Sequence, residues 1–232
     1  MTCNTDIPTL DGDATIPAYV SQPQGEPHAA IIVIQEIFGV NRGIRKKADD
    51  WAALGYLAIA PDVFWRQKPG IELDADIPEQ FQEAIGYMMK HDFDLGIRDV
   101  EAVIHWLRRE KGIAKVGLVG FCMGGRIAYL TATRTDIDAS VGYYGVMIDQ
   151  MLGEKHAIAK PLMLHVPTAD GFVPPESQKA MHEGLDDHPK VTIHDYEGLD
   201  HGFAAEFGKR RVEDGAALAN QRTAEFFAKH LG

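Results

Sequence analysis

Short apolar runs alternate along this chain with longer segments whose apolar residues recur at helical spacing. Residues 29–34 are apolar without interruption, as expected of a strand that is buried on both faces. Further runs predict strands at 56–60, 116–119, 161–166 and, with more mixed polarity, 191–196. Near-continuous apolar strands of this kind belong to a parallel sheet that helices cover on both sides.

Helical patterns fill the intervals between these strands. In residues 94–109 the apolar side chains form one stripe, made of Leu95, Val100, Val103, Ile104 and Leu107. Other helices are predicted at 43–54, 78–90, 126–134, 175–185 and 215–230. Repeated strand–helix–strand order predicts an α/β fold with a doubly wound, mostly parallel sheet. In such sheets ligand chemistry collects at the carboxyl ends of the strands.

Composition narrows the possible partners. The 232 residues fit one α/β domain, and because no repeat or linker interrupts them we expect a single domain spanning 1–232. Lys and Arg number 23 against 34 Asp and Glu, a formal net charge of −11. Nucleic acid and anionic membranes attract positively charged proteins, so neither is an expected partner.

Compartment and cofactors are inferred from what the sequence lacks. No apolar run approaches the roughly 18 residues of a membrane span, and the first residues lack the pattern of a secretory signal. The two cysteines, Cys3 and Cys122, are too few for a disulfide framework. We therefore expect a cytoplasmic protein. No clustered His, Asp or Glu spacing predicts a metal site, and no other cofactor is expected.

Residues 115–125 are the most informative segment for chemistry. A predicted strand ends at Gly120, a helical pattern follows Gly125, and Cys122 lies between them in a Gly-x-Cys-x-Gly arrangement. This is the nucleophile elbow of α/β-hydrolases, with cysteine in place of the usual serine. The turn is so tight that a Cβ at either flanking glycine would strike the backbone. The alternative is a buried structural cysteine in an ordinary turn.

Two further residues fit the roles of acid and base. In α/β-hydrolases the acid and then the histidine follow the nucleophile along the chain. Asp170 follows one predicted strand and His201 follows the next, so both fall on loops at strand carboxyl ends. Asp170 could instead be a turn aspartate, and Asp200 could be the acid. Adjacent side chains rarely point at each other, so we predict Cys122, Asp170 and His201 as the catalytic residues.

The sequence resembles the dienelactone hydrolase family, the carboxymethylenebutenolidases of chlorocatechol degradation, over nearly its whole length. Two motifs together are specific to this group: Gln-Glu-Ile-Phe-Gly at 35–39 and Gly-x-Cys-x-Gly-Gly at 120–125. Further matches lie at 55–56, 60–62, 141–146, 170–174, 202–203, 217–220 and 222–223. The resemblance implies an α/β-hydrolase fold, a small-molecule ester or lactone substrate, and a monomer.

The resemblance also implies roles for residues around the cysteine. The backbone amides of Ile37 and Met123 would form the oxyanion hole. Glu36 would hold the cysteine proton in the resting enzyme and release a thiolate when substrate arrives. The alternative for Glu36 is a strand-end carboxylate bound to nearby amides. The residues expected to contact substrate are Phe38, Phe81, Tyr143, Phe172 and Ala205.

One departure from the family pattern bears on the substrate. In family members two arginines bind the substrate carboxylate, and one of them also pairs with the glutamate. At the matching positions this chain has Phe81 and Ala205, which cannot replace a bidentate clamp. Arg66 and Arg126 are conceivable replacements.

We therefore expect cleavage of an ester or enol-lactone bond through a thioester acyl-enzyme. One alternative is a hydrolase of neutral activated aryl or enol esters that has no role in dienelactone turnover. The other is a non-catalytic redox or ligand-binding module in which Cys122 is merely oxidised.

Overall fold

A computed structural model describes residues 3–232, which form two compact units. The first unit ends at Gly117 and the second begins at Leu118. The single domain expected from the sequence remains a prediction.

The first unit has four strands beside one another in the order β1 (Thr5–Pro8), β2 (Thr15–Ser21), β4 (Leu57–Pro61) and β3 (Ala30–Ile34). The pairs β1/β2 and β2/β4 are antiparallel, whereas β3 and β4 are parallel. All residues of β3 and β4 are buried, as their apolar runs predict. In β2 the pattern alternates, with Ile16 and Ala18 fully buried between more exposed neighbours.

Three helices belong to the first unit, and local sequence signals fix where each begins. α1 (Arg42–Ala53) packs on β2, β3 and β4, and the Asn41 side chain caps it by accepting from two backbone amides. α2 (Pro78–Met89) begins at a proline, which suits the first helical position. α3 (Phe93–Arg109) packs against β1 and is capped by Asp92.

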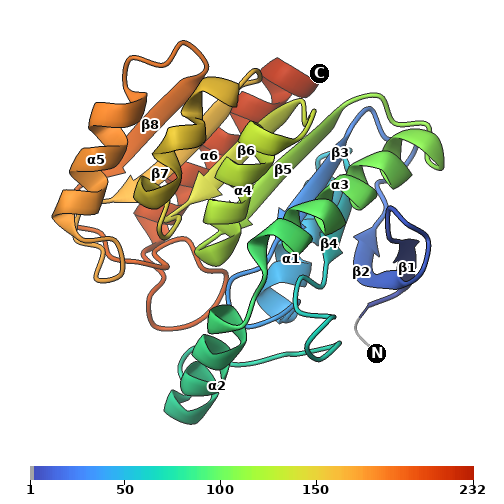
Figure 1. Cartoon of the computed structure of the whole chain (residues 1–232), viewed down its shortest axis with the longest axis horizontal. Helices are drawn as coiled ribbons and strands as arrows, with labels where there is room; N and C mark the ends of the chain where they lie inside the picture. Colours follow the sequence, from blue (N-terminus) through green and yellow to red (C-terminus); the bar gives the residue numbers. More distant parts are fainter. Residues whose placement is uncertain (1–2) are drawn as a thin grey trace. The chain divides into compact units, whose positions relative to one another are not determined.

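The second unit continues the alternation of strand and helix. β5 (Val116–Phe121) begins in the first unit and leads into α4 (Met123–Arg134), and β6 (Ala139–Tyr143) follows. The 3-10 helix η1 (Asp149–Ala157), β7 (Leu162–Pro167), α5 (Pro175–Leu185), β8 (Val191–Tyr196) and α6 (Glu213–Leu231) complete the unit. β6, β7 and β8 are parallel neighbours. In Figure 1, α4 and α5 lie in front of these strands and α6 lies behind them.

Every strand and helix predicted from the sequence is present, with ends that differ by at most three residues. β1, β2 and β6 were not predicted. β2 contains Pro17 and β6 contains Gly142, and each has too few apolar residues in a row to resemble a fully buried strand. The antiparallel β1 and β2 also escape the strand–helix–strand rule, because no helix connects them.

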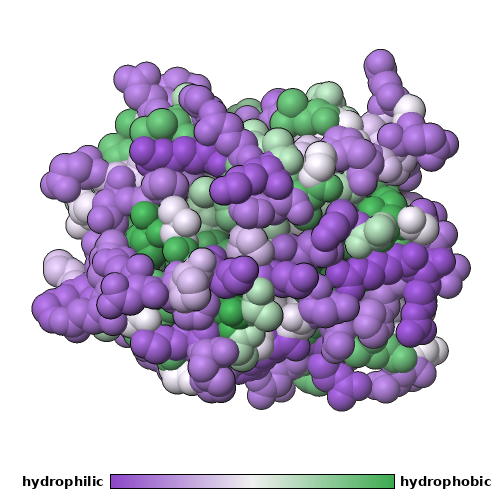
Figure 2. All heavy atoms as spheres, turned by 90° about the horizontal axis from the view of Figure 1, so that it is seen from above, coloured by the Kyte–Doolittle hydropathy of each residue, from purple (hydrophilic) through white to green (hydrophobic). Residues whose placement is uncertain are grey.

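One face of the molecule shows little continuous apolar area. On the face drawn in Figure 2, hydrophilic side chains predominate and hydrophobic ones appear in small, separate patches. None of the helices in residues 3–232 combines the length and the hydrophobicity that crossing a bilayer requires.

A buried hydrogen-bond network ties α6 to three strands of the second unit. His165 on β7 has its Nδ1 2.7 Å from the Tyr196 hydroxyl on β8, and its Nε2 2.9 Å from Thr223 Oγ1 on α6. Thr223 Oγ1 also lies 2.6 Å from the hydroxyl of Tyr143 on β6. Burial lowers the pKa of His165 well below its ordinary value, so the ring is neutral. Thr223 is therefore the junction through which α6 joins the sheet.

We predict that Thr223→Val lowers the free energy of unfolding by about 1 to 3 kcal/mol, because it leaves the buried His165 Nε2 without its partner. Valine has nearly the same shape, so packing should change little. The matched control is Thr15→Val on the exposed start of β2, expected to change stability by less than about 0.5 kcal/mol. Urea denaturation of both variants measures the difference, and equal effects would show that the network contributes no net stability.

Candidate active site

Cys122 occupies a strained turn between β5 and α4. Its φ and ψ are 56° and −114°, in a region that residues other than glycine rarely enter. Its N–H donates to the carbonyl of Tyr143 on β6 at 3.0 Å, and its own carbonyl accepts from Gly125 N at 2.9 Å. Strain of this kind is characteristic of the nucleophile turn in α/β-hydrolases.

Glycines make this turn possible. A Cβ on Gly120 would lie 1.9 Å from the carbonyl oxygen of Gly124, a distance at which the backbone would have to move. A Cβ on Gly125 would lie 2.7 Å from the carbonyl oxygen of Tyr143. The crowding predicted for the glycine before the cysteine is therefore confirmed at Gly120. The elbow can form because β5, α4 and β6 approach without side chains between their backbones.

Asp170 and His201 form a buried pair on the loops that follow β7 and β8. His201 Nδ1 lies 2.9 Å and 3.1 Å from the two carboxylate oxygens of Asp170. Asp170 Oδ1 also accepts from the amides of Phe172 and Val173 at 2.8 Å and 3.1 Å. Asp170 therefore acts as a turn aspartate and contacts the histidine at the same time. Its amide bonds hold the carboxylate in place for the imidazole.

The electrostatics of His201 depend on the cysteine. Burial lowers the pKa of His201, but the charge of Cys122 and hydrogen bonds with Asp170 and Cys122 more than offset this effect and raise it to about 10. An imidazolium that contacts both the sulfur and the carboxylate follows from this arrangement. Such a group can carry a proton between the cysteine and a bound molecule.

Asp200 connects the Asp170 loop to the His201 loop, and its carboxylate does not bond the imidazole. Its Oδ1 accepts from the backbone amides of His201 at 2.7 Å and Gly171 at 2.9 Å. These bonds link the loop that carries the acid to the loop that carries the histidine. Arg210 lies 3.5 Å from the other carboxylate oxygen, and its guanidinium carbon lies 5.3 Å from the centre of the Phe172 ring.

The aromatic residues near His201 differ in part from those predicted. The ring of Phe172, which is 47% exposed, lies 4.8 Å from the imidazole, as a substrate contact should. Tyr143 is fully buried, and its hydroxyl bonds Thr223 and Asn220. Its side chain is directed into the interior network, so its predicted substrate contact is not supported. The neighbouring Tyr144, not predicted, has its ring 4.9 Å from His201.

Glu36, Ile37, Phe38 and Phe81 lie in the first unit, and Met123 lies in the second. Glu36 is half-buried and follows the carboxyl end of β3, and Ile37 beside it is buried. The rings of Phe38 and Phe81 lie 5.8 Å apart and form an apolar contact between this turn and α2. Met123 is the first residue of α4, so the helix itself offers no acceptor to its N–H.

Four arginines are candidate replacements for the two that the resemblance implies at positions 81 and 205. Arg66 is engaged by both carboxylate oxygens of Asp99 at 2.7 Å and 3.2 Å. Arg126 is buried in the first turn of α4, and its Nη1 lies 3.4 Å from Met147 Sδ. Sequence reasoning did not identify Arg210 or Arg211, because the loop after His201 carries no motif that would identify them.

Arg211 lies next to one of the two replaced positions. Its Nη1 donates to the backbone carbonyl of Ala205 at 3.0 Å, while its other nitrogens bind the carboxylate of Glu213 at 2.8 Å and 3.0 Å. A cation is thus present beside Ala205, but a carboxylate of the chain already engages it. Across residues 3–232, no group of three or more His, Cys, Asp or Glu side chains is arranged to hold a metal ion.

The order of the Cys122 turn, the Asp170 loop and the His201 loop along alternating strands and helices is that of an α/β-hydrolase. Residues 16–231 match the Dienelactone hydrolase family, and the chain belongs to that family. It is therefore a hydrolase of the ester and lactone class, and the fold expected from the sequence is confirmed.

Individual relatives agree with this assignment. The chain is 36% identical to a carboxymethylenebutenolidase of Pseudomonas putida, over 98% of this chain and 97% of that protein. It is 41% identical to a protein of Azospirillum brasilense, over 98% of this chain and the whole of the relative. A crystal structure from Klebsiella pneumoniae superposes with a TM-score of 0.83 at 29% identity, covering 97% of this chain and 99% of the other.

Proposed function

We propose that the protein cleaves an ester or enol-lactone bond of a small molecule, with Cys122 as nucleophile, His201 as acid and base, and Asp170 as the residue that orients it. The observation that carries this proposal is the continuous contact from the Cys122 sulfur through the His201 ring to the Asp170 carboxylate. A structural cysteine would need no buried imidazolium beside it.

The first half-reaction forms a thioester. The Cys122 thiolate attacks the carbonyl carbon, and the amides of Ile37 and Met123 would donate to the oxyanion that develops. When the bond to the leaving oxygen breaks, that oxygen takes the proton of the His201 imidazolium. Asp170 holds the ring so that Nδ1 keeps its proton while the other nitrogen reacts.

The second half-reaction restores the enzyme. A water molecule attacks the thioester carbon and gives a proton to the now neutral His201. The carbon–sulfur bond then breaks, which releases the acid and returns Cys122 to a thiolate beside an imidazolium. No electrons are gained or lost overall, and no cofactor enters the sequence of steps.

A carboxylate that holds the Cys122 proton in the resting enzyme would control when the thiolate becomes reactive. Glu36 is proposed to exchange a proton with the cysteine as substrate arrives, because it follows the carboxyl end of β3 within the motif shared with the family.

The leaving group decides which esters react well. A cysteine thiol has a pKa of about 8.5, so its thiolate leaves a tetrahedral intermediate far more readily than an alkoxide does. The intermediate therefore collapses back to substrate unless the departing oxygen is stabilised as an enolate or a phenolate. Enol lactones and aryl esters should outpace simple alkyl esters.

The replaced arginines favour neutral activated esters as a second candidate class. An unpaired carboxylate is costly to place in a partly dry pocket. Phe81 contacts Phe38 where the family resemblance implies a cation, and Arg211, which lies beside Ala205, is bound to Glu213. These contacts support a preference for neutral aryl and enol esters over carboxylated lactones.

We predict that Cys122→Ala reduces hydrolysis of an aryl acetate to less than about a hundredth, because loss of a covalent nucleophile normally costs far more. Alanine is smaller than cysteine, so the urea midpoint should shift little. Cys3→Ala is the matched control and should leave kcat/KM unchanged. More than a hundredth of the activity in Cys122→Ala would contradict a covalent role.

Asp170→Asn and His201→Ala should each lower kcat by about 1,000-fold or more, since the first upsets the tautomer and the second removes the proton carrier. Asp200→Asn should be much milder. Its remaining amide oxygen can still accept from the His201 and Gly171 amides. Steady-state kinetics with one aryl ester compares the three variants. A larger loss in Asp200→Asn than in Asp170→Asn would mean that the orienting acid is misassigned.

We predict that Ala205→Arg raises kcat/KM for carboxylated lactones at least about tenfold, by supplying a cation for the substrate carboxylate. It should leave kcat/KM for neutral aryl esters nearly unchanged. The measurement compares matched charged and neutral substrates on both proteins. If the unmodified protein already prefers the carboxylated lactone, another cation serves the pocket, and Arg126, Arg210 and Arg211 are the ones to substitute.

A further inference from the structure

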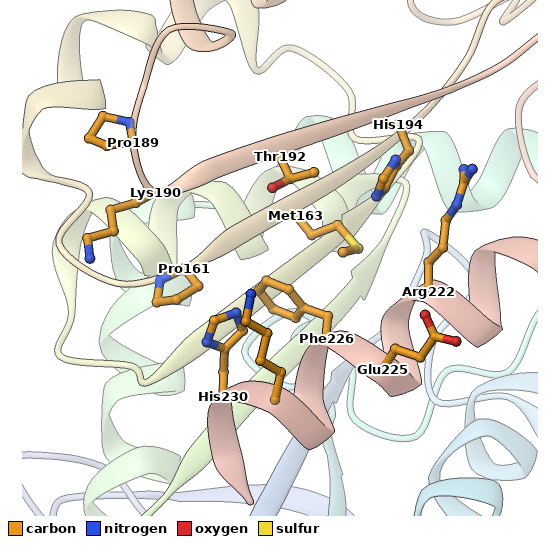
Figure 3. Close-up of a pocket in the computed structure, with 11 residues that line it drawn as sticks. Pro161, Met163, Pro189, Lys190, Thr192, His194, Arg222, Glu225, Phe226 and His230 are labelled. Atoms are coloured by element: carbon orange, nitrogen blue, oxygen red, sulfur yellow. The ribbon is translucent and has the colours of Figure 1, made fainter.

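The second unit has a hollow that lies apart from the cysteine turn. It occupies about 560 Å³ between the outer side of α6 and strand β8, within the size range of small-molecule sites. α6 packs on β6 and β7, so part of the surface of β8 on this side is left uncovered. Figure 3 shows the lining side chains, which come from α6, from β8, and from β7 and the residues that precede the two strands.

The lining of this hollow is cationic although the chain is acidic. Lys190, Arg222 and Lys229 face a single lining carboxylate, Glu225, in a protein whose formal net charge is −11. Glu225 accepts a hydrogen bond from the Gln221 side chain at 2.9 Å. Within the described residues, none of the three cations forms an ion pair. Three such cations attract an anion from solution.

Two histidines of the lining lie close to these cations. Burial and then the charge of Arg222 lower the pKa of His194, and burial followed by Lys229 and Lys190 lowers the pKa of His230. Both rings are therefore neutral near pH 7 and can donate or accept hydrogen bonds. The two ends of the hollow are each formed by a histidine and at least one permanent cation.

The middle of the hollow is apolar. Met163 on β7 and Phe226 on α6 lie between Lys190 on one side and the Arg222–His194 pair on the other (Figure 3). Phe226 is 8% exposed and Met163 is 7% exposed, so both side chains belong to the floor. A simple inorganic anion would leave this apolar floor uncovered. A flat hydrocarbon body with a negative group would contact floor and rim together.

We propose that the hollow between β8 and α6 is a binding site for a small organic anion with an aromatic or similarly flat apolar body. The anionic group binds Arg222 or Lys190, and the body lies on Met163 and Phe226. The site is separate from the proposed catalytic residues, because none of its lining residues is Cys122, Asp170 or His201. The proposal does not depend on the proposed reaction.

The test uses three probes on the intact protein: 2-naphthoate, its neutral analogue 2-naphthalenemethanol, and inorganic phosphate. The histidine Cε1–H signals are followed by NMR during each titration. We expect 2-naphthoate to shift the signals of His194 and His230 saturably and to raise the pKa of both rings, because a bound anion offsets the neighbouring cations. The His201 signal separates this site from any binding near Cys122.

Variants of equal charge locate the site. Lys190→Ala combined with Arg222→Ala should weaken 2-naphthoate binding by at least about tenfold. The control, Lys179→Ala combined with Arg98→Ala, removes the same charge from exposed positions elsewhere and should bind as the unmodified protein does.

Several results would overturn the proposal. If 2-naphthoate bound equally to the two double variants, Lys190 and Arg222 would have no part in binding it. Equal binding of the neutral alcohol, or of phosphate, would show that the charge or the apolar floor plays no part. No shift at His194 and His230 would mean that no such ligand binds. Shifts that follow protein concentration instead of ligand would assign the hollow to a second copy of the chain.

Discussion

The backbone turn at Cys122 is the constraint on which the rest of the site depends. A residue other than glycine at φ 56° costs on the order of 1 to 3 kcal/mol, and the conformation persists only where the surroundings hold it. Here they do, through the bond from Cys122 N–H to Tyr143 and those from Gly125 and Arg126 to the Cys122 carbonyl. These bonds need close backbone contact between α4 and β6, which requires Gly125, while Gly120 lets β5 turn tightly into α4.

The partners of the cysteine are held in place by similar main-chain bonds. Asp170 is fixed by the amides that follow it, and Asp200 ties the acid loop to His201. Behind them, Tyr143 connects the strand that accepts the Cys122 N–H to the network of His165 and Thr223. The main-chain bonds thus hold Asp170 and His201 in place, which is the preorganisation that the proposed mechanism needs.

Much of this could be predicted from the sequence, for physical reasons that particular residues illustrate. The strand and helix around Cys122 have clear hydrophobic patterns. The spacing of the glycines there reflects a steric requirement that can be recognised in a single sequence. Asp170 and His201 follow buried strands, so their order along the chain was enough to select the two loops on which the structure pairs them. The same reasoning did not predict β2, whose Ile16 and Ala18 alternate with more exposed residues. Nor did it predict that Tyr143 points into the interior network while Tyr144 lies beside His201.

Charge placement was harder to predict because it depends on long side chains in loops. Arg66 was a conceivable clamp from its sequence position, yet it binds Asp99, and Arg211 reaches Ala205 from six residues away. Nothing in the local pattern encodes those directions. The cationic hollow of Lys190, Arg222 and Lys229 likewise arises only when β8 and α6 are brought together.

The most direct test of a cysteine-based mechanism is to identify the covalent intermediate. The protein is mixed with excess aryl acetate, quenched in acid within the first turnovers, digested and examined by mass spectrometry. The account predicts an acetyl group on the peptide that contains Cys122, which disappears on treatment with neutral hydroxylamine because thioesters are cleaved by it. Hydrolysis that proceeds with Cys122 never acylated, or an acetyl group that forms on another side chain at the rate of turnover, would contradict it.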